Sequence, residues 1–212
     1  MIFFEQEDKR HPEAIRNISY GFILGALTTF FALAIQLGLN YLFAETEIGS
    51  RSPLAITIFA TVEEILKFLA VFYIVRVHRY FDEPVDAMIY MVTVALGFAA
   101  VENVASLITQ GGILQSGLTL KTFEILTLRF LGATLLHSLA SAVVGFHWAV
   151  GLIAKKNIGW HIFAGLVIAS LLHTVFNYLI ISTGPASWAL AFVIIISFFV
   201  LIDFEKLKTK EG

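Results

Sequence analysis

The sequence predicts an all-α membrane protein, a polytopic bundle of about six transmembrane helices with both termini in the cytoplasm. Of its 212 residues, 58% are hydrophobic and only 14% are charged, whereas about a quarter of the residues in a typical soluble domain are charged. Mean hydropathy is +0.84, and apolar runs long enough to cross a bilayer recur along the chain. We therefore expect a multi-pass protein of the cell membrane rather than a soluble fold with one anchor.

Six apolar spans form the predicted membrane domain, residues 17–202. An interfacial lead-in at 1–16 precedes it, and a charged tail at 203–212, expected to be mobile in the cytoplasm, follows it. The spans cover about 17–43, 53–75, 85–109, 122–154, 160–183 and 187–202.

Local signals support these boundaries. Pro53 opens the second span, and proline fits the first turn of a helix. The fourth span is longer than a bilayer needs, so we expect it to be tilted or to project at one end. The connections are polar or contain glycine and proline: 44–52, 76–84, the stretch around Gly111–Gly117, 155–159 and Gly184-Pro185.

Basic residues in the loops predict the orientation of the bundle. With a cytoplasmic N-terminus, ten lysines and arginines fall on the cytoplasmic side and two on the other, which is the bias expected of membrane proteins. The ten are Lys9, Arg10, Arg16, Arg76, Arg79, Lys155, Lys156, Lys206, Lys208 and Lys210, and the two are Arg51 and Lys121.

The second span carries Glu63, Glu64 and Lys67 in its middle. A charge at this depth costs about 2.5–3.5 kcal/mol on insertion scales, so it persists only where it faces protein or water and finds partners. Lys67 is four residues from Glu63 and three from Glu64, and both spacings allow an ion pair on one helix face. We expect Lys67 to pair with one carboxylate and to leave the other available.

Three more spans carry polar groups at similar depth. The third contains Glu102 and Asn103, the fourth Arg129 and His137, and the fifth His173 and Asn177. Counting from the loops places Glu63 and Glu64, Glu102, His137 and His173 between the midplane and the outer leaflet. Convergence in one pocket is the least costly way to satisfy these groups, and Arg129 is a candidate partner for Glu102 or Glu64.

Carboxylates and imidazoles in one pocket can activate water. A carboxylate can act as general base, and a histidine with an amide can stabilise an oxyanion. The same residues, Glu63, Glu102, His137 and His173, could instead hold Zn²⁺ with an open position, and the spacing leaves both versions open. The chain has no cysteine, which excludes thiolate ligands and a cysteine nucleophile.

Taken together, these motifs resemble the PrsW family of intramembrane proteases, which is related to the CAAX-protease and bacteriocin-processing superfamily. The resemblance covers about residues 60–180. The superfamily has an arginine one position after Lys67 and a phenylalanine four residues before His137, and this chain has neither. These departures fit PrsW better than a prenyl-protein protease. The motifs that carry the resemblance are Glu63-Glu64-Ile-Leu-Lys67, Asp82-Glu-Pro-Val-Asp-Ala-Met-Ile-Tyr90, Gly97-Phe-Ala-Ala-Val-Glu102-Asn103, Arg129 with His137, and His173-x-x-x-Asn177.

The resemblance implies hydrolysis of a peptide bond in a membrane-associated protein, in a prokaryotic plasma membrane. Members of the family are classed as metalloproteases, and the superfamily is also interpreted as glutamic-type. We favour the metal-free version with no cofactor, because His-Glu-x-x-His is absent and Glu102-Asn103 is an unusual zinc donor set. Zn²⁺ is the alternative cofactor. The expected partners are a membrane protein or peptide substrate and the lipid bilayer, with no nucleic acid.

Roles follow for the predicted residues. Glu63 is the expected general base, with Glu64 as alternate, and Lys67 pairs with the other carboxylate. His137 orients the water, and His173 and Asn177 stabilise the oxyanion. Glu102 and Asn103 complete the polar cluster, as a second acid or as orienting groups, and Arg129 is a supporting residue. The alternative function is a proton-coupled transporter or channel that uses the same Glu/His groups as a relay.

Overall fold

Six long α-helices make up the described part of the chain, which contains no strand. The computed structural model describes residues 15–44, 46, 49, 51–77, 81, 83–109, 120–182 and 186–211, excluding the side chains at 107, 109, 120–126, 128, 129, 182, 186 and 208–211. The helices are α2 (Ile15–Ala44), α3 (Pro53–Val77), α4 (Asp86–Thr109), α6 (Leu120–Ala154), α7 (Ile158–Ser182) and α8 (Ala186–Glu211).

The predicted all-α membrane bundle is confirmed. Five helices, α2, α4, α6, α7 and α8, are long and apolar enough to cross a membrane. The remaining helix, α3, has 25 residues and carries Glu63, Glu64 and Lys67 in its middle. The first five helices begin and end within two residues of the predicted spans.

The C-terminal segment differs from its prediction. The helix α8 does not stop at 202 but continues to Glu211, so the segment expected to be mobile is helical. Phe204 and Leu207 are buried in the main hydrophobic core, and this burial stabilises the last turns in spite of their charged neighbours. The predicted lead-in lies outside the described residues except for Ile15 and Arg16, which begin α2. The orientation stays a prediction.

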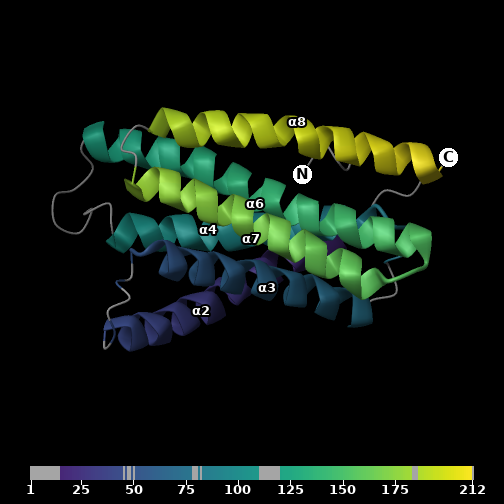
Figure 1. The fold of residues 1–212 in the computed structure, drawn as a ribbon, viewed down its shortest axis with the longest axis horizontal. Coiled ribbons are helices and arrows are strands. Elements are labelled where there is room, and N and C mark those ends of the chain that lie inside the picture. The colour runs from purple at the N-terminus through teal and green to yellow at the C-terminus, as the bar shows by residue number, and fades with distance from the viewer. Residues whose placement is uncertain are drawn as a thin grey trace.

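The helices run side by side along the long axis of the molecule, with α2 and α8 at opposite edges (Figure 1). In the interior, α4 packs against α2, α3 and α6, while α7 packs against α3, α6 and α8. Two-thirds of the α4 span is buried. The edge helices instead expose large apolar side chains, including Phe30 and Phe31 on α2 and Phe198 and Phe199 on α8, as expected for surfaces that face lipid.

Glycines allow α4 to approach its neighbours closely. A Cβ atom on Gly97 would collide with the carbonyl oxygen of Phe22 on α2, and one on Gly145 of α6 would lie 2.6 Å from the Cα atom of Met88. Small residues at such contacts let helix backbones pack tightly in membranes. This packing fixes α4 beside α6, and α3 contacts both of them as well as α7. The polar side chains of these four helices therefore lie within reach of one another.

Candidate active site

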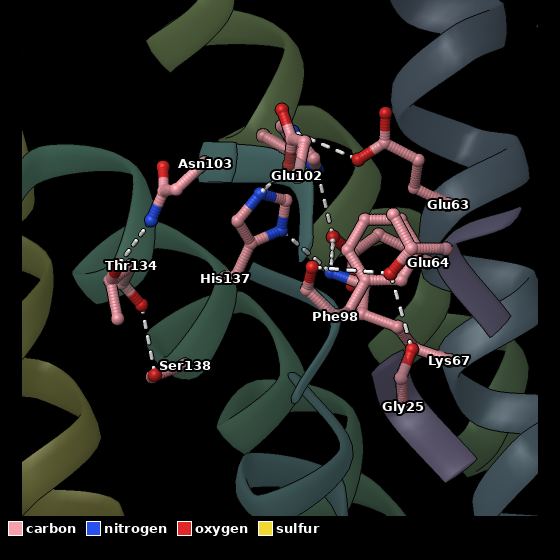
Figure 2. Close-up of polar contacts among 12 residues, drawn as sticks. Gly25, Glu63, Glu64, Lys67, Phe98, Glu102, Asn103, Thr134, His137 and Ser138 are labelled. Atoms are coloured by element: carbon pink, nitrogen blue, oxygen red, sulfur yellow. Dashed lines mark hydrogen bonds and ion pairs between the residues drawn. The ribbon is translucent and has the colours of Figure 1, made fainter. Parts of the chain in front are cut away.

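Five ionisable side chains from four helices meet inside the bundle. Glu63 and Glu64 come from α3, Glu102 from α4, His137 from α6 and His173 from α7, and we call them the acid–imidazole cluster. Figure 2 labels its first four members, Glu63, Glu64, Glu102 and His137. All are buried except Glu102, which is partly exposed. The two imidazole rings pack edge to face with centroids 4.8 Å apart.

Lys67 pairs with Glu64 and not with Glu63. Its Nζ lies 2.5 Å from Glu64 Oε1, and both side chains are 0% exposed. Glu64 Oε1 also accepts a hydrogen bond from His173 Nδ1 at 2.8 Å. Sequence spacing allowed either pairing, and the structure contains the i,i+3 pair. Glu64 is thus held by a cation and an imidazole, while Glu63 has no such cation.

The partners of each imidazole assign its hydrogens. Lys67 Nζ lies 3.1 Å from His137 Nδ1. Because an ammonium group can only donate a hydrogen bond, His137 Nδ1 is the acceptor. The proton of His137 then lies on Nε2, which is 2.6 Å from Glu102 Oε2. In His173, Nδ1 donates to Glu64, which leaves the lone pair of Nε2 directed towards Glu63 Oε2 at 3.6 Å.

Glu63 is held by a residue that the sequence reasoning missed. Gln36 of α2 donates from Nε2 to Glu63 Oε1 at 2.6 Å. The other oxygen, Oε2, is buried and accepts no hydrogen bond within the described part of the chain. The available signal was Gln36 itself, which with Asn40 is an amide near the outer end of an otherwise apolar span, because an amide inside a membrane helix requires a partner.

A cavity of about 650 Å³ lies against the cluster. Glu102, His137 and Asn177 contribute to its polar lining, and so does Arg51, which precedes α3 and which the sequence reasoning did not include in the site. The remaining walls are apolar: Ala133, Leu136, Phe176, Ile180 and Ile181. The cavity therefore reaches two members of the cluster, Glu102 and His137.

The supporting residues of the prediction have different environments. The Asn103 amide donates to Thr134 Oγ1 at 3.0 Å and so links α4 to α6 (Figure 2). Lys67 lies inside the cluster, and its Nζ is 5.4 Å from the centroid of the Phe98 ring. The Arg129 side chain lies outside the described residues, so its predicted pairing stays a prediction.

Three members of the cluster could hold a metal ion. Glu63, His137 and His173 each offer a ligand atom, and these atoms lie within 4.8 Å of one another. Carboxylate oxygen and imidazole nitrogen are the ligands of catalytic zinc sites. Counted in their ionised forms, Glu63, Glu64 and Glu102 exceed Lys67 by two negative charges, which one divalent cation or two protons would balance. Together with the unpartnered Oε2 atom of Glu63, this donor set fits a divalent metal.

Comparison with known proteins identifies the family of this chain. The sequence pattern described as "PrsW family intramembrane metalloprotease" matches residues 13–202. The Protease PrsW of Geobacillus kaustophilus is 28% identical over 182 residues, which are 86% of this chain and 75% of that protein. The Protease PrsW of Bacillus subtilis is 26% identical over 191 residues, covering 89% and 79% of the two chains. No solved structure matches significantly. With its apolar helices and bacterial relatives, the chain is a multi-pass cell-membrane protein and belongs to the PrsW family of intramembrane metalloproteases.

Proposed function

We propose that the acid–imidazole cluster hydrolyses a peptide bond of a membrane-associated protein, with Glu63 as the general base. One observation carries this proposal: Glu63 Oε2 and His173 Nε2 face each other at 3.6 Å, in a cluster whose other members Glu102 and His137 line a cavity together with Asn177. Membership of a protease family supports the reaction class.

The nucleophile is a water molecule held by Glu63 and His173. Because Glu63 Oε2 and His173 Nε2 are both acceptors and are 3.6 Å apart, one water beside them can donate a hydrogen bond to each. Its lone pair is then free to attack a carbonyl carbon, and Glu63 takes the proton. Glu64 is less suited to this role, because its Oε1 atom is shared by Lys67 and His173.

The geometry supports different roles for His137 and His173 from those expected from the sequence. His173 faces Glu63 and is the better candidate to orient the water, whereas His137 lines the cavity with Glu102. Glu102, whose Oε2 atom lies 2.6 Å from His137 Nε2, is the second acid in its protonated form. It gives its own proton to the leaving amine, and it regains a proton when Glu63 releases the one taken from water. Asn177 offers its amide N–H groups to the oxyanion from the cavity wall.

A metal would bind at the same place. Glu63, His137 and His173 would hold it, and when bound it would polarise the scissile carbonyl and favour ionisation of water. The roles of Asn177 in binding the oxyanion and of Gln36 in orienting Glu63 are the same in both versions. Elemental analysis of the purified protein, combined with cleavage assays after chelation, distinguishes them.

The test is a cleavage assay in proteoliposomes that contain a single-span substrate protein. Glu63→Gln is expected to abolish cleavage, and so is the double variant Glu63→Gln/Glu64→Gln. Glu205→Gln is the matched control, because this exposed glutamate of α8 lies outside the cluster. Full activity of the double variant, with folding verified by circular dichroism, would refute the proposal.

A further inference from the structure

We infer that Arg51 is a specificity residue that binds a carboxylate of the substrate about five residues from the scissile bond. The inference rests on the proposed peptidase function and names the class of substrate that this site takes. It starts from the cavity, in which Arg51 is the cation among the described lining residues.

The position of Arg51 is fixed by the start of α3. Ser52 accepts a hydrogen bond from the Ala55 amide at 3.2 Å through its Oγ atom, which is the contact of an N-cap residue. The backbone N–H of Ser52 in turn donates to Gly49 at 2.8 Å. These contacts anchor the turn that contains Arg51, which lines the cavity from this fixed point.

The polar lining of the cavity is of two kinds. Glu102 and His137 belong to the acid–imidazole cluster and Asn177 lies beside them on the lining, whereas Arg51 is a cation that comes from the turn before α3. The rest of the lining is apolar and includes Phe176 and Ile180. A matching substrate therefore has apolar side chains next to the scissile bond and an anionic group further along. No hydrogen bond or ion pair occupies the guanidinium of Arg51 in the described part of the chain.

The length of α3 gives an estimate of how many substrate residues separate the scissile bond from the carboxylate. Arg51 precedes Glu63 by twelve positions, which corresponds to about 18 Å along a helix. A segment must be extended to present a peptide bond for attack, and an extended chain advances about 3.3 Å per residue. About five residues therefore separate the scissile bond from the carboxylate, and the reach of the arginine side chain widens this to about four to six.

The bound group is a carboxylate, which guanidinium groups recognise through paired hydrogen bonds. It can belong to an aspartate or glutamate side chain or to the C-terminus of a substrate. A remote contact of this kind binds ground state and transition state alike, so its loss raises KM and leaves kcat unchanged.

The experiment uses the full chain in neutral phosphatidylcholine vesicles with synthetic single-span peptides of leucine, alanine and valine. One position beyond the apolar span carries Asp, Asn or Lys, and mass spectrometry locates the cleaved bond. Wild type is expected to cut four to six residues from the Asp, with kcat/KM about tenfold above that of the Asn peptide. Peptides that end at this distance, with free or amidated C-termini, separate a side-chain carboxylate from a terminal one.

Variants at Arg51 test the charge directly. Arg51→Gln should bring the ratio of kcat/KM between the Asp and Asn peptides down to about one, whereas Arg51→Glu should favour the Lys peptide. Lys155→Gln removes an exposed cation elsewhere in the chain and should keep the preference for Asp.

Three results would overturn the inference. Equal cleavage of Asp and Asn peptides by wild type, with Glu63→Gln inactive, would reject it and leave the peptidase function standing. A loss in Arg51→Gln that depends on phosphatidylglycerol in the vesicles, and not on peptide charge, would assign Arg51 to a lipid phosphate. If wild type and Glu63→Gln both cleave none of the peptides, the proposed function fails together with the inference.

Discussion

Replacing Lys67 with methionine is expected to destabilise the protein by about 3–5 kcal/mol, the cost of removing one partner of a buried ion pair. The size follows from the geometry, because the 2.5 Å contact with Glu64 joins two side chains that are both 0% exposed. Methionine keeps the apolar stem but leaves the Glu64 carboxylate buried without its cation. The free energy of unfolding, measured by steric trapping in bicelles, reports the change.

The double variant Glu64→Gln/Lys67→Met isolates the charge effect. It removes both charges and leaves an amide oxygen that can accept from His173, so it is expected to lie within about 1–2 kcal/mol of wild type. Lys67→Met should therefore lower the free energy of unfolding by less in the Glu64→Gln background than in wild type. This coupling is the difference that a double-mutant cycle measures.

The chain contains a matched control for burial. Asp203 and Lys206 form an ion pair with the same i,i+3 spacing at 3.0 Å, but their side chains are 27% and 57% exposed. Lys206→Met should therefore cost less than about 1 kcal/mol. If Lys67→Met costs no more than Lys206→Met, or if the costs of Lys67→Met and Glu64→Gln simply add, the argument from burial is wrong.

Three further outcomes can be tested. Gln36→Leu should lower kcat by about tenfold with little change in KM, because the proposed base loses the donor that orients it; steady-state kinetics in proteoliposomes would show an unchanged kcat if the hydrogen bond has no role in catalysis. Asn177→Leu should lower kcat by about 10²-fold, the effect of losing one oxyanion donor, and a change confined to KM would contradict that role. Gly97→Leu should destabilise the fold by more than about 1–3 kcal/mol, because its Cβ collides with backbone of α2. Gly38→Leu, at a position with open space around it, is the control, and equal melting temperatures of the two variants would contradict the packing argument.

The sequence predicted most of the fold because span boundaries depend on local signals. Prolines, glycines and charged loops mark where apolar runs stop, and these marks located α2 to α7 within two residues. The end of α8 was missed because Asp203 begins a charged stretch. The helix continues because Phe204 and Leu207 bury against other helices, a tertiary contact that local composition does not report.

The site shows the same division between local and tertiary information. Depth along each span could be counted, and this predicted which side chains share a layer. The rotation of each helix about its axis could not be predicted in this way. The pairing of Lys67 with Glu64 and not with Glu63 depends on the neighbouring helices. The contact of Gln36 with Glu63 and the place of Arg51 on the cavity depend on packing between segments distant in sequence.

The charged middle of α3 has a consequence for how the enzyme is made. During synthesis α3 emerges before the residues that stabilise it, since Lys67 meets His137 70 positions later and Glu64 meets His173 109 positions later. Until α7 arrives, the acids of α3 have no imidazole partner and insert poorly into lipid. On the proposed mechanism, a nascent or truncated chain without α7 lacks His173 and is expected to be inactive, so proteolytic competence requires that synthesis has passed α7.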